Sequence, residues 1–106
     1  MQAIDLKSTT IGVIGLGFMG SAISAHIVAA GYDLIGFDID RQRLEMLLAK
    51  GGRAASSTRE VAEKAAVVLT SLPSLAAFED VIRGPEGILS ARREGLIVME
   101  CARWIF

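Results

Sequence analysis

Residues 10–20 read Thr-Ile-Gly-Val-Ile-Gly-Leu-Gly-Phe-Met-Gly, a short apolar run that leads directly into the spacing Gly-x-Gly-x-x-Gly. The apolar run predicts a buried strand, and the residues after Gly20 predict an amphipathic helix. In this order Gly15 permits a tight turn, Gly17 lets a ligand approach the backbone, and Gly20 allows the helix to pack closely on the sheet. The turn presents unpaired N–H groups at the positive end of the helix dipole, which favours a bound diphosphate.

A second strand and a carboxylate follow at the expected distance. Gly31 is typical of a residue that ends a helix, and residues 32–38 read Tyr-Asp-Leu-Ile-Gly-Phe-Asp, a strand that closes on an acid. Asp38 lies 18 residues beyond the last glycine of the motif, close to the roughly 20 expected for the acid that accepts hydrogen bonds from a ribose. Its charge would repel a 2′-phosphate, so NAD is favoured, while Arg41 and Arg43 leave NADP open. The alternative is an ordinary strand-to-helix turn in which Asp38 or Asp40 only caps the next helix.

Composition indicates a single globular domain. The chain has 106 residues, of which 52% are apolar and 22% are charged, and its net charge is −1. Basic residues are scattered apart from the pair Arg92-Arg93, so nucleic acid is not an expected partner. One cysteine and one histidine provide no metal-ligand set. No apolar run approaches the roughly 18 residues that span a bilayer, and residues 1–5 lack the features of a signal peptide, so we expect a cytoplasmic location and no membrane partner.

The rest of the chain alternates between helical and strand patterns. Asp40, Ser57 and Ser74 each precede apolar residues at helical spacing and predict three further helices. Further strands are predicted at residues 53–55, 66–72 and 96–99. Short connections between alternating strands and helices predict an α/β fold, a Rossmann-like doubly wound parallel sheet that is incomplete at about five strands. The ligand crevice of such a sheet lies at the carboxyl ends of the strands.

The glycine-rich run and the stretch Val67–Ser74, which ends in Leu-Pro-Ser, resemble the β-hydroxyacid dehydrogenase family. This family includes 3-hydroxyisobutyrate, L-threonate and 6-phosphogluconate dehydrogenases. The resemblance implies that residues 1–106 are an NAD(P)-binding domain, and it carries over Leu72 and Pro73 as cofactor contacts. A proline that simply ends a strand is the alternative for Pro73. The expected cofactor-binding residues are Gly15, Leu16, Gly17, Phe18, Met19, Gly20, Asp38, Leu72 and Pro73.

The resemblance breaks off after Cys101. In the family the strand corresponding to residues 95–100 is followed by a Ser-Thr pair that helps to hold the substrate carboxylate, whereas Ala102 and Arg103 stand at those positions here. The family's catalytic lysine lies in a second, helical domain, which we expect to be absent from a truncated chain. We therefore expect no catalytic residue and no metal site, and whether the chain is an enzyme stays open.

Two functions from different classes remain. The first is the NAD-binding, or NADP-binding, domain of an oxidoreductase that acts on the hydroxyl of a small β-hydroxyacid and is inactive alone. The alternative is a stand-alone nucleotide-binding or regulatory module without catalysis. The expected partners are a nicotinamide dinucleotide, a small hydroxyacid only where a second domain is supplied, and a second copy of the chain that pairs with an exposed sheet edge to form a homodimer.

Overall fold

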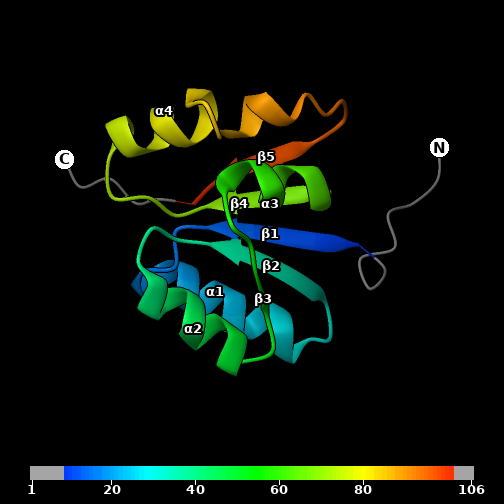
Figure 1. The fold of residues 1–106 in the computed structure, drawn as a ribbon. Coiled ribbons are helices and arrows are strands. Elements are labelled where there is room, and N and C mark those ends of the chain that lie inside the picture. The colour runs from blue at the N-terminus through cyan, green and yellow to red at the C-terminus, as the bar shows by residue number, and fades with distance from the viewer. Residues whose placement is uncertain (1–8, 102–106) are drawn as a thin grey trace.

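The computed structural model describes residues 9–101, which form a five-stranded parallel sheet with helices on both faces (Figure 1). The strands are β1 (Thr10–Ile14), β2 (Asp33–Phe37), β3 (Arg53–Ala54), β4 (Val67–Thr70) and β5 (Ile97–Glu100). The helices are α1 (Phe18–Ala29), α2 (Arg41–Ala49), α3 (Thr58–Lys64), α4 (Leu75–Arg83) and the 3-10 helix η1 (Ile88–Ala91). The predicted Rossmann-like α/β fold is confirmed.

The strand order β3-β2-β1-β4-β5 places the first strand at the centre. From β1 the chain proceeds outward through β2 and β3, then crosses to the other side of β1 to form β4 and β5. The connections after β1 and β4 therefore leave the sheet in opposite directions. In parallel sheets this reversal opens a crevice at the carboxyl ends of the strands, where ligands bind.

Two apolar cores lie on opposite faces of the sheet. Successive side chains of a strand point to opposite faces, so Val13 packs with Leu34 and Leu47 on the side of α1 and α2, whereas Ile14 packs with Val61 on the other side. Figure 1 shows α1 and α2 on one face and α3 and α4 on the other. The central strand is covered on both sides, which explains its continuous apolar sequence.

The predicted helix starts are confirmed. The side chains of Asp40, Ser57 and Ser74 each accept a hydrogen bond from an N–H of the first helical turn, at 2.9, 3.1 and 3.1 Å. In a usual capping box the Glu at the third helical position accepts from the N–H of the N-cap residue. In α3 the carboxylate of Glu60 accepts instead from the N–H of Ser56, one residue before the N-cap Ser57, at 2.6 Å. Within residues 9–101 no helix is long and apolar enough to cross a membrane.

Candidate functional site

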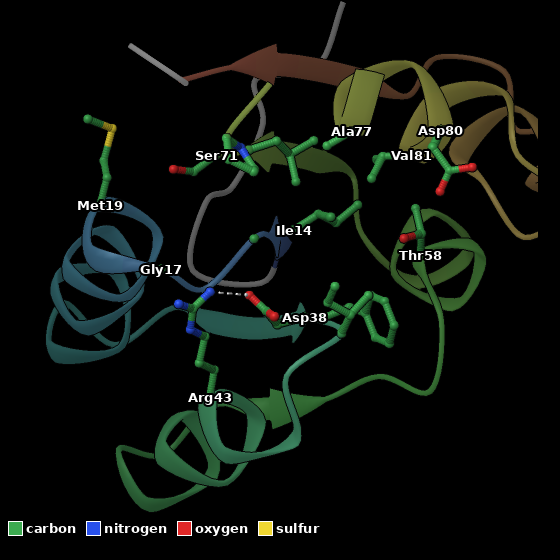
Figure 2. Close-up of a pocket in the computed structure, with 15 residues that line it drawn as sticks. Ile14, Gly17, Met19, Asp38, Arg43, Thr58, Ser71, Ala77, Asp80 and Val81 are labelled. Carbon is green, nitrogen blue, oxygen red and sulfur yellow. Dashed lines mark ion pairs between the residues drawn. The ribbon is translucent and has the colours of Figure 1, made fainter. Parts of the chain in front are cut away.

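A cavity of about 570 Å³ opens at the carboxyl ends of the central strands (Figure 2). The segments after β1, β2 and β4 contribute to its wall, as do α3 and α4. Six of the nine predicted cofactor residues line it, namely Gly15, Gly17, Met19, Asp38, Leu72 and Pro73. The cavity therefore coincides with the crevice that the strand order requires.

Two glycines of the motif are required by the turn itself. Gly15 has a φ of +92°, which side chains rarely tolerate, and a Cβ there would overlap the carbonyl oxygen of Ser71. Its N–H donates to the carbonyl of Phe37 at 2.9 Å, which ties the turn to β2. A Cβ on Gly20 would overlap the carbonyl oxygen of Gly15. Gly20 thus allows the start of α1 to pack closely against the backbone that follows β1.

Gly17 differs from these two glycines. It is the N-cap of α1 with a φ of −68°, a value open to any residue, and no side chain accepts a hydrogen bond at this helix start. The atom closest to a Cβ at this position is Nη1 of Arg43 at 3.7 Å, which is ordinary van der Waals contact. Gly17 also lines the cavity. The packing of the described chain therefore does not require a glycine at this position. A ligand that lies close to the backbone would require one, because a Cβ would occupy the same space.

Asp38 follows β2 and is only 8% exposed, although it lines the cavity. Its Oδ2 accepts a hydrogen bond from the N–H of Leu16 at 2.7 Å, and its Oδ1 accepts from the N–H of Asp40 at 2.8 Å. The carboxylate thus braces the glycine turn against the start of α2. Two carboxylate oxygens offer about four acceptor positions, so Asp38 keeps capacity to accept from a ribose hydroxyl.

Arg43 reaches from α2 to the same corner of the cavity. Its Nη1 lies 3.6 Å from Oδ2 of Asp38 and its Nε lies 3.7 Å from Oδ2 of Asp40, as Figure 2 shows for the first pair. The side chain is about half exposed, so the pairs are screened and the guanidinium keeps room to move. A cation therefore lies beside the acid that was predicted to favour NAD.

The other predicted cofactor residues lie in different surroundings. Leu72 and Pro73 follow β4, on the opposite side of the crevice from Asp38. Three residues do not line the cavity: Leu16 is 2% exposed and its side chain packs in the core with Val13, Gly20 is buried in the first turn of α1, and Phe18 is 97% exposed.

Nine of the fifteen residues that line the cavity were not among the predicted cofactor residues, and four of these nine come from α3 and α4. Thr58 comes from the start of α3, and Ala77, Asp80 and Val81 come from one face of α4. The positions of these four residues, near the start of helices on either side of the strand at 66–72, could have indicated that they line the crevice. A helix that follows a parallel strand begins at the carboxyl edge of the sheet, so residues three and four apart in its first turns face the crevice. The structure brings these residues together with Asp38 although at least 20 residues separate them in sequence.

Cys101 ends the described chain just after β5, at the same edge of the sheet. Burial, followed by the negative charge of Glu100, raises the pKa of its thiol. The thiol is therefore protonated at neutral pH, which makes it a poor nucleophile. Within residues 9–101 no three His, Cys, Asp or Glu side chains lie close enough to hold a metal ion.

A glycine turn at a helix start, a braced carboxylate after the next strand and a cavity at the strand reversal together define a dinucleotide-binding domain of the Rossmann type. Residues 10–104 match the model of the NAD binding domain of 6-phosphogluconate dehydrogenase. The chain therefore belongs to this family of NAD-binding domains of hydroxyacid dehydrogenase-like oxidoreductases. The predicted family and nicotinamide cofactor are confirmed.

Known relatives are similar over most of this chain but are much longer. The "probable 3-hydroxyisobutyrate dehydrogenase-like 3, mitochondrial" of Arabidopsis thaliana is 37% identical over 99 residues, which cover 93% of this chain and 31% of that protein. The 2-(hydroxymethyl)glutarate dehydrogenase of Eubacterium barkeri is 33% identical over 94 residues, which cover 89% of this chain and 31% of that protein. The solved 3-hydroxyisobutyrate dehydrogenase of Mycobacterium tuberculosis has a TM-score of 0.77 and 34% identity, and the match covers 89% of this chain and 31% of that one. The chain thus spans under a third of the length of these relatives.

Proposed function

We propose that the chain, over residues 1–106, is an NAD(P)-binding domain that binds NAD as the cofactor part of an oxidoreductase acting on the hydroxyl of a small β-hydroxyacid. The observation that carries this proposal is the glycine at position 17. It lines the cavity at a helix start without a side-chain cap, and the described chain leaves space for a Cβ there. A diphosphate on the N–H groups of this helix start would need that space.

The other predicted residues would hold the rest of the dinucleotide. Asp38 would accept from the ribose hydroxyls with its free acceptor positions, since its other positions hold the turn in place. Met19, Leu72 and Pro73 would bound the nicotinamide side. The predicted set also includes Gly15, Leu16, Phe18 and Gly20, which would act through the backbone of the turn and the start of α1.

The bound cofactor would supply a hydride acceptor or donor. None of the nine proposed residues carries a side chain suited to proton transfer at the substrate, apart from Asp38, which is engaged by two N–H groups. Turnover therefore needs groups from another part of a longer protein. Relatives named as dehydrogenases support this, because the chain covers 31% of their length. A longer protein that binds NAD but oxidises no hydroxyacid would favour the alternative, a nucleotide-binding module without catalysis.

We further propose a preference for NAD over NADP, because Asp38 would repel a 2′-phosphate. The nearby Arg43 reduces this preference through its charge.

We also propose a cytoplasmic location and a homodimer through the edge strand β5, in which Ile97 and Met99 are 46% and 53% exposed. Localisation of the tagged full-length protein and sedimentation of the purified chain test these two points.

Calorimetric titration of the chain with NAD and NADP tests the binding proposal. Gly17→Ala should melt within a few degrees of the wild type, because the added Cβ meets only Arg43 at 3.7 Å. Its affinity for NAD should fall at least about tenfold, since the methyl group holds the diphosphate away from the backbone. The matched control is Ala22→Leu, which adds bulk on the exposed face of α1 outside the cavity. A folded wild type that binds no dinucleotide, or a Gly17→Ala variant that binds as tightly, would refute the proposal.

A further inference from the structure

Thr58 and Asp80 face each other across one end of the cavity, as Figure 2 shows. Thr58 is only 8% exposed, yet its hydroxyl makes no hydrogen bond with residues 9–101. The carboxylate of Asp80 likewise has no hydrogen-bond or ion-pair partner in this part of the chain. Among the described residues only the hydroxyl of Ser24 is a buried side-chain polar atom without a partner, so the Thr58 hydroxyl is open to the cavity, and Asp80 is an exposed residue. Both polar groups are therefore available to a ligand that enters this end of the cavity.

The walls around this pair are apolar. Phe37 and Val81 line the cavity beside Thr58 and Asp80, and Ala77 lies one turn before Val81 on α4. A smaller cavity of about 350 Å³ shares Phe37, Thr58, Asp80 and Val81 with the first, so the cleft continues past the pair. Where the two cavities meet, the apolar side chains of Phe37 and Val81 therefore flank one hydroxyl and one acceptor-only carboxylate, whereas Ser56, Ser57 and Glu86 line the smaller cavity beyond this point.

We propose that Thr58 and Asp80 recognise the base of the bound dinucleotide and select adenine by its 6-amino group. This inference rests on the proposed binding of NAD, with Asp38 at the ribose next to these two residues. A purine has apolar faces that suit these walls. The edge of adenine carries an amino donor beside a ring-nitrogen acceptor. The carboxylate of Asp80 can only accept, and the hydroxyl of Thr58 can donate, so the two edges are complementary.

The carboxylate of Asp80 cannot donate a hydrogen bond, so it should discriminate adenine from bases that present an acceptor at the same position. Hypoxanthine carries a carbonyl oxygen in place of the amino group, which would set two acceptors against each other at Asp80. A site built around a hydrogen bond rejects an analogue that lacks the donor much more strongly than an apolar pocket does, because its own polar group then loses a partner. Asp80 is a specificity residue in this scheme. Glu79 beside it is also exposed but does not line the cavity, so it is the matched comparison.

The test compares NAD with nicotinamide hypoxanthine dinucleotide on the whole chain by calorimetry. The wild type should prefer NAD by at least about tenfold. In Asp80→Asn the side-chain amide can accept or donate, so the preference should fall below about threefold, mainly through tighter binding of the analogue. Glu79→Gln removes the same charge one residue away and should leave the preference unchanged. The N–H of Gly84 bonds to the backbone carbonyl of Asp80, so the end of α4 should survive the substitution.

Thr58→Val provides a second variant, since it keeps the shape of a buried side chain and removes only the hydroxyl. It should weaken NAD several-fold without lowering the melting temperature, because the hydroxyl has no partner within residues 9–101. Equal binding of the two dinucleotides by the wild type, or an equal change in Glu79→Gln and Asp80→Asn, would overturn this inference alone. Binding of neither dinucleotide by the folded chain would overturn the proposed function and the inference together.

Discussion

Replacing Asp38 by alanine should destabilise the fold as well as weaken cofactor binding. The carboxylate accepts from the N–H of Leu16 at 2.7 Å in a buried position and from the N–H of Asp40 at 2.8 Å. A buried N–H left without an acceptor costs about 1–3 kcal/mol. We expect the free energy of unfolding to fall by about 2 kcal/mol, which lowers the melting temperature by about 8–16 °C for a domain of this size. Circular dichroism at pH 7 measures both quantities.

Asp38→Asn is the informative comparison. It keeps one oxygen that can accept from the N–H of Leu16, but its NH₂ group then faces the N–H of Asp40. Its loss of stability should be about half that of the alanine variant, while both variants lose affinity for NAD, measured below the melting temperature of each. An alanine variant that melts with the wild type would show that the carboxylate does not brace the turn, and the proposed orientation of Asp38 would fail with it.

Two further predictions concern groups outside the cavity. Ser24 is 1% exposed and its hydroxyl finds no partner among the described residues, so Ser24→Ala should raise the free energy of unfolding by about 1 kcal/mol in urea titrations, and a loss would contradict the assignment. The ammonium of Lys64, followed by the N–H of Ser56, lowers the pKa of Glu60 to about 2. The stabilisation from this carboxylate is therefore complete above its ordinary pKa of 4.5 and is lost as the pH falls through about 2. Wild type and Glu60→Gln should differ in free energy of unfolding by less than about 1 kcal/mol at pH 7, because the pair is exposed. This difference should shrink toward pH 3, and a difference that stays constant would contradict the prediction.

The secondary structure was largely predictable because its signals are local. Caps act within three residues, and the apolar runs that became β1 and β4 are contiguous. The predicted strand at 66–72 is longer than β4, which ends at Thr70. The N–H of Ser71 donates to the carbonyl of Ile14, so the backbone pairing continues one residue past β4 before the chain turns toward α4.

The site was predictable only in part. The glycine motif and Asp38 belong to one βαβ unit with a regular spacing, so a pattern could identify them. Thr58 and Asp80 carry no such pattern. They lie on two different helices and meet only because both connections cross the same face of the sheet. The bracing of Leu16 by Asp38 was also beyond the sequence, since it joins groups 22 residues apart.

By itself the sequence determined the order of strands and helices, the family and the kind of ligand, because propensity, capping and glycine geometry act over a few neighbouring residues. Tertiary structure alone decided which glycines serve the turn and which leaves space in the cavity, since a Cβ clash depends on distant backbone such as the carbonyl of Ser71 at Gly15. It also decided which polar groups stay without a partner at the edge of the crevice, Thr58 and Asp80 among them. Hydrogen bonding and packing between elements depend on positions in space, and these arise only when the sheet has formed.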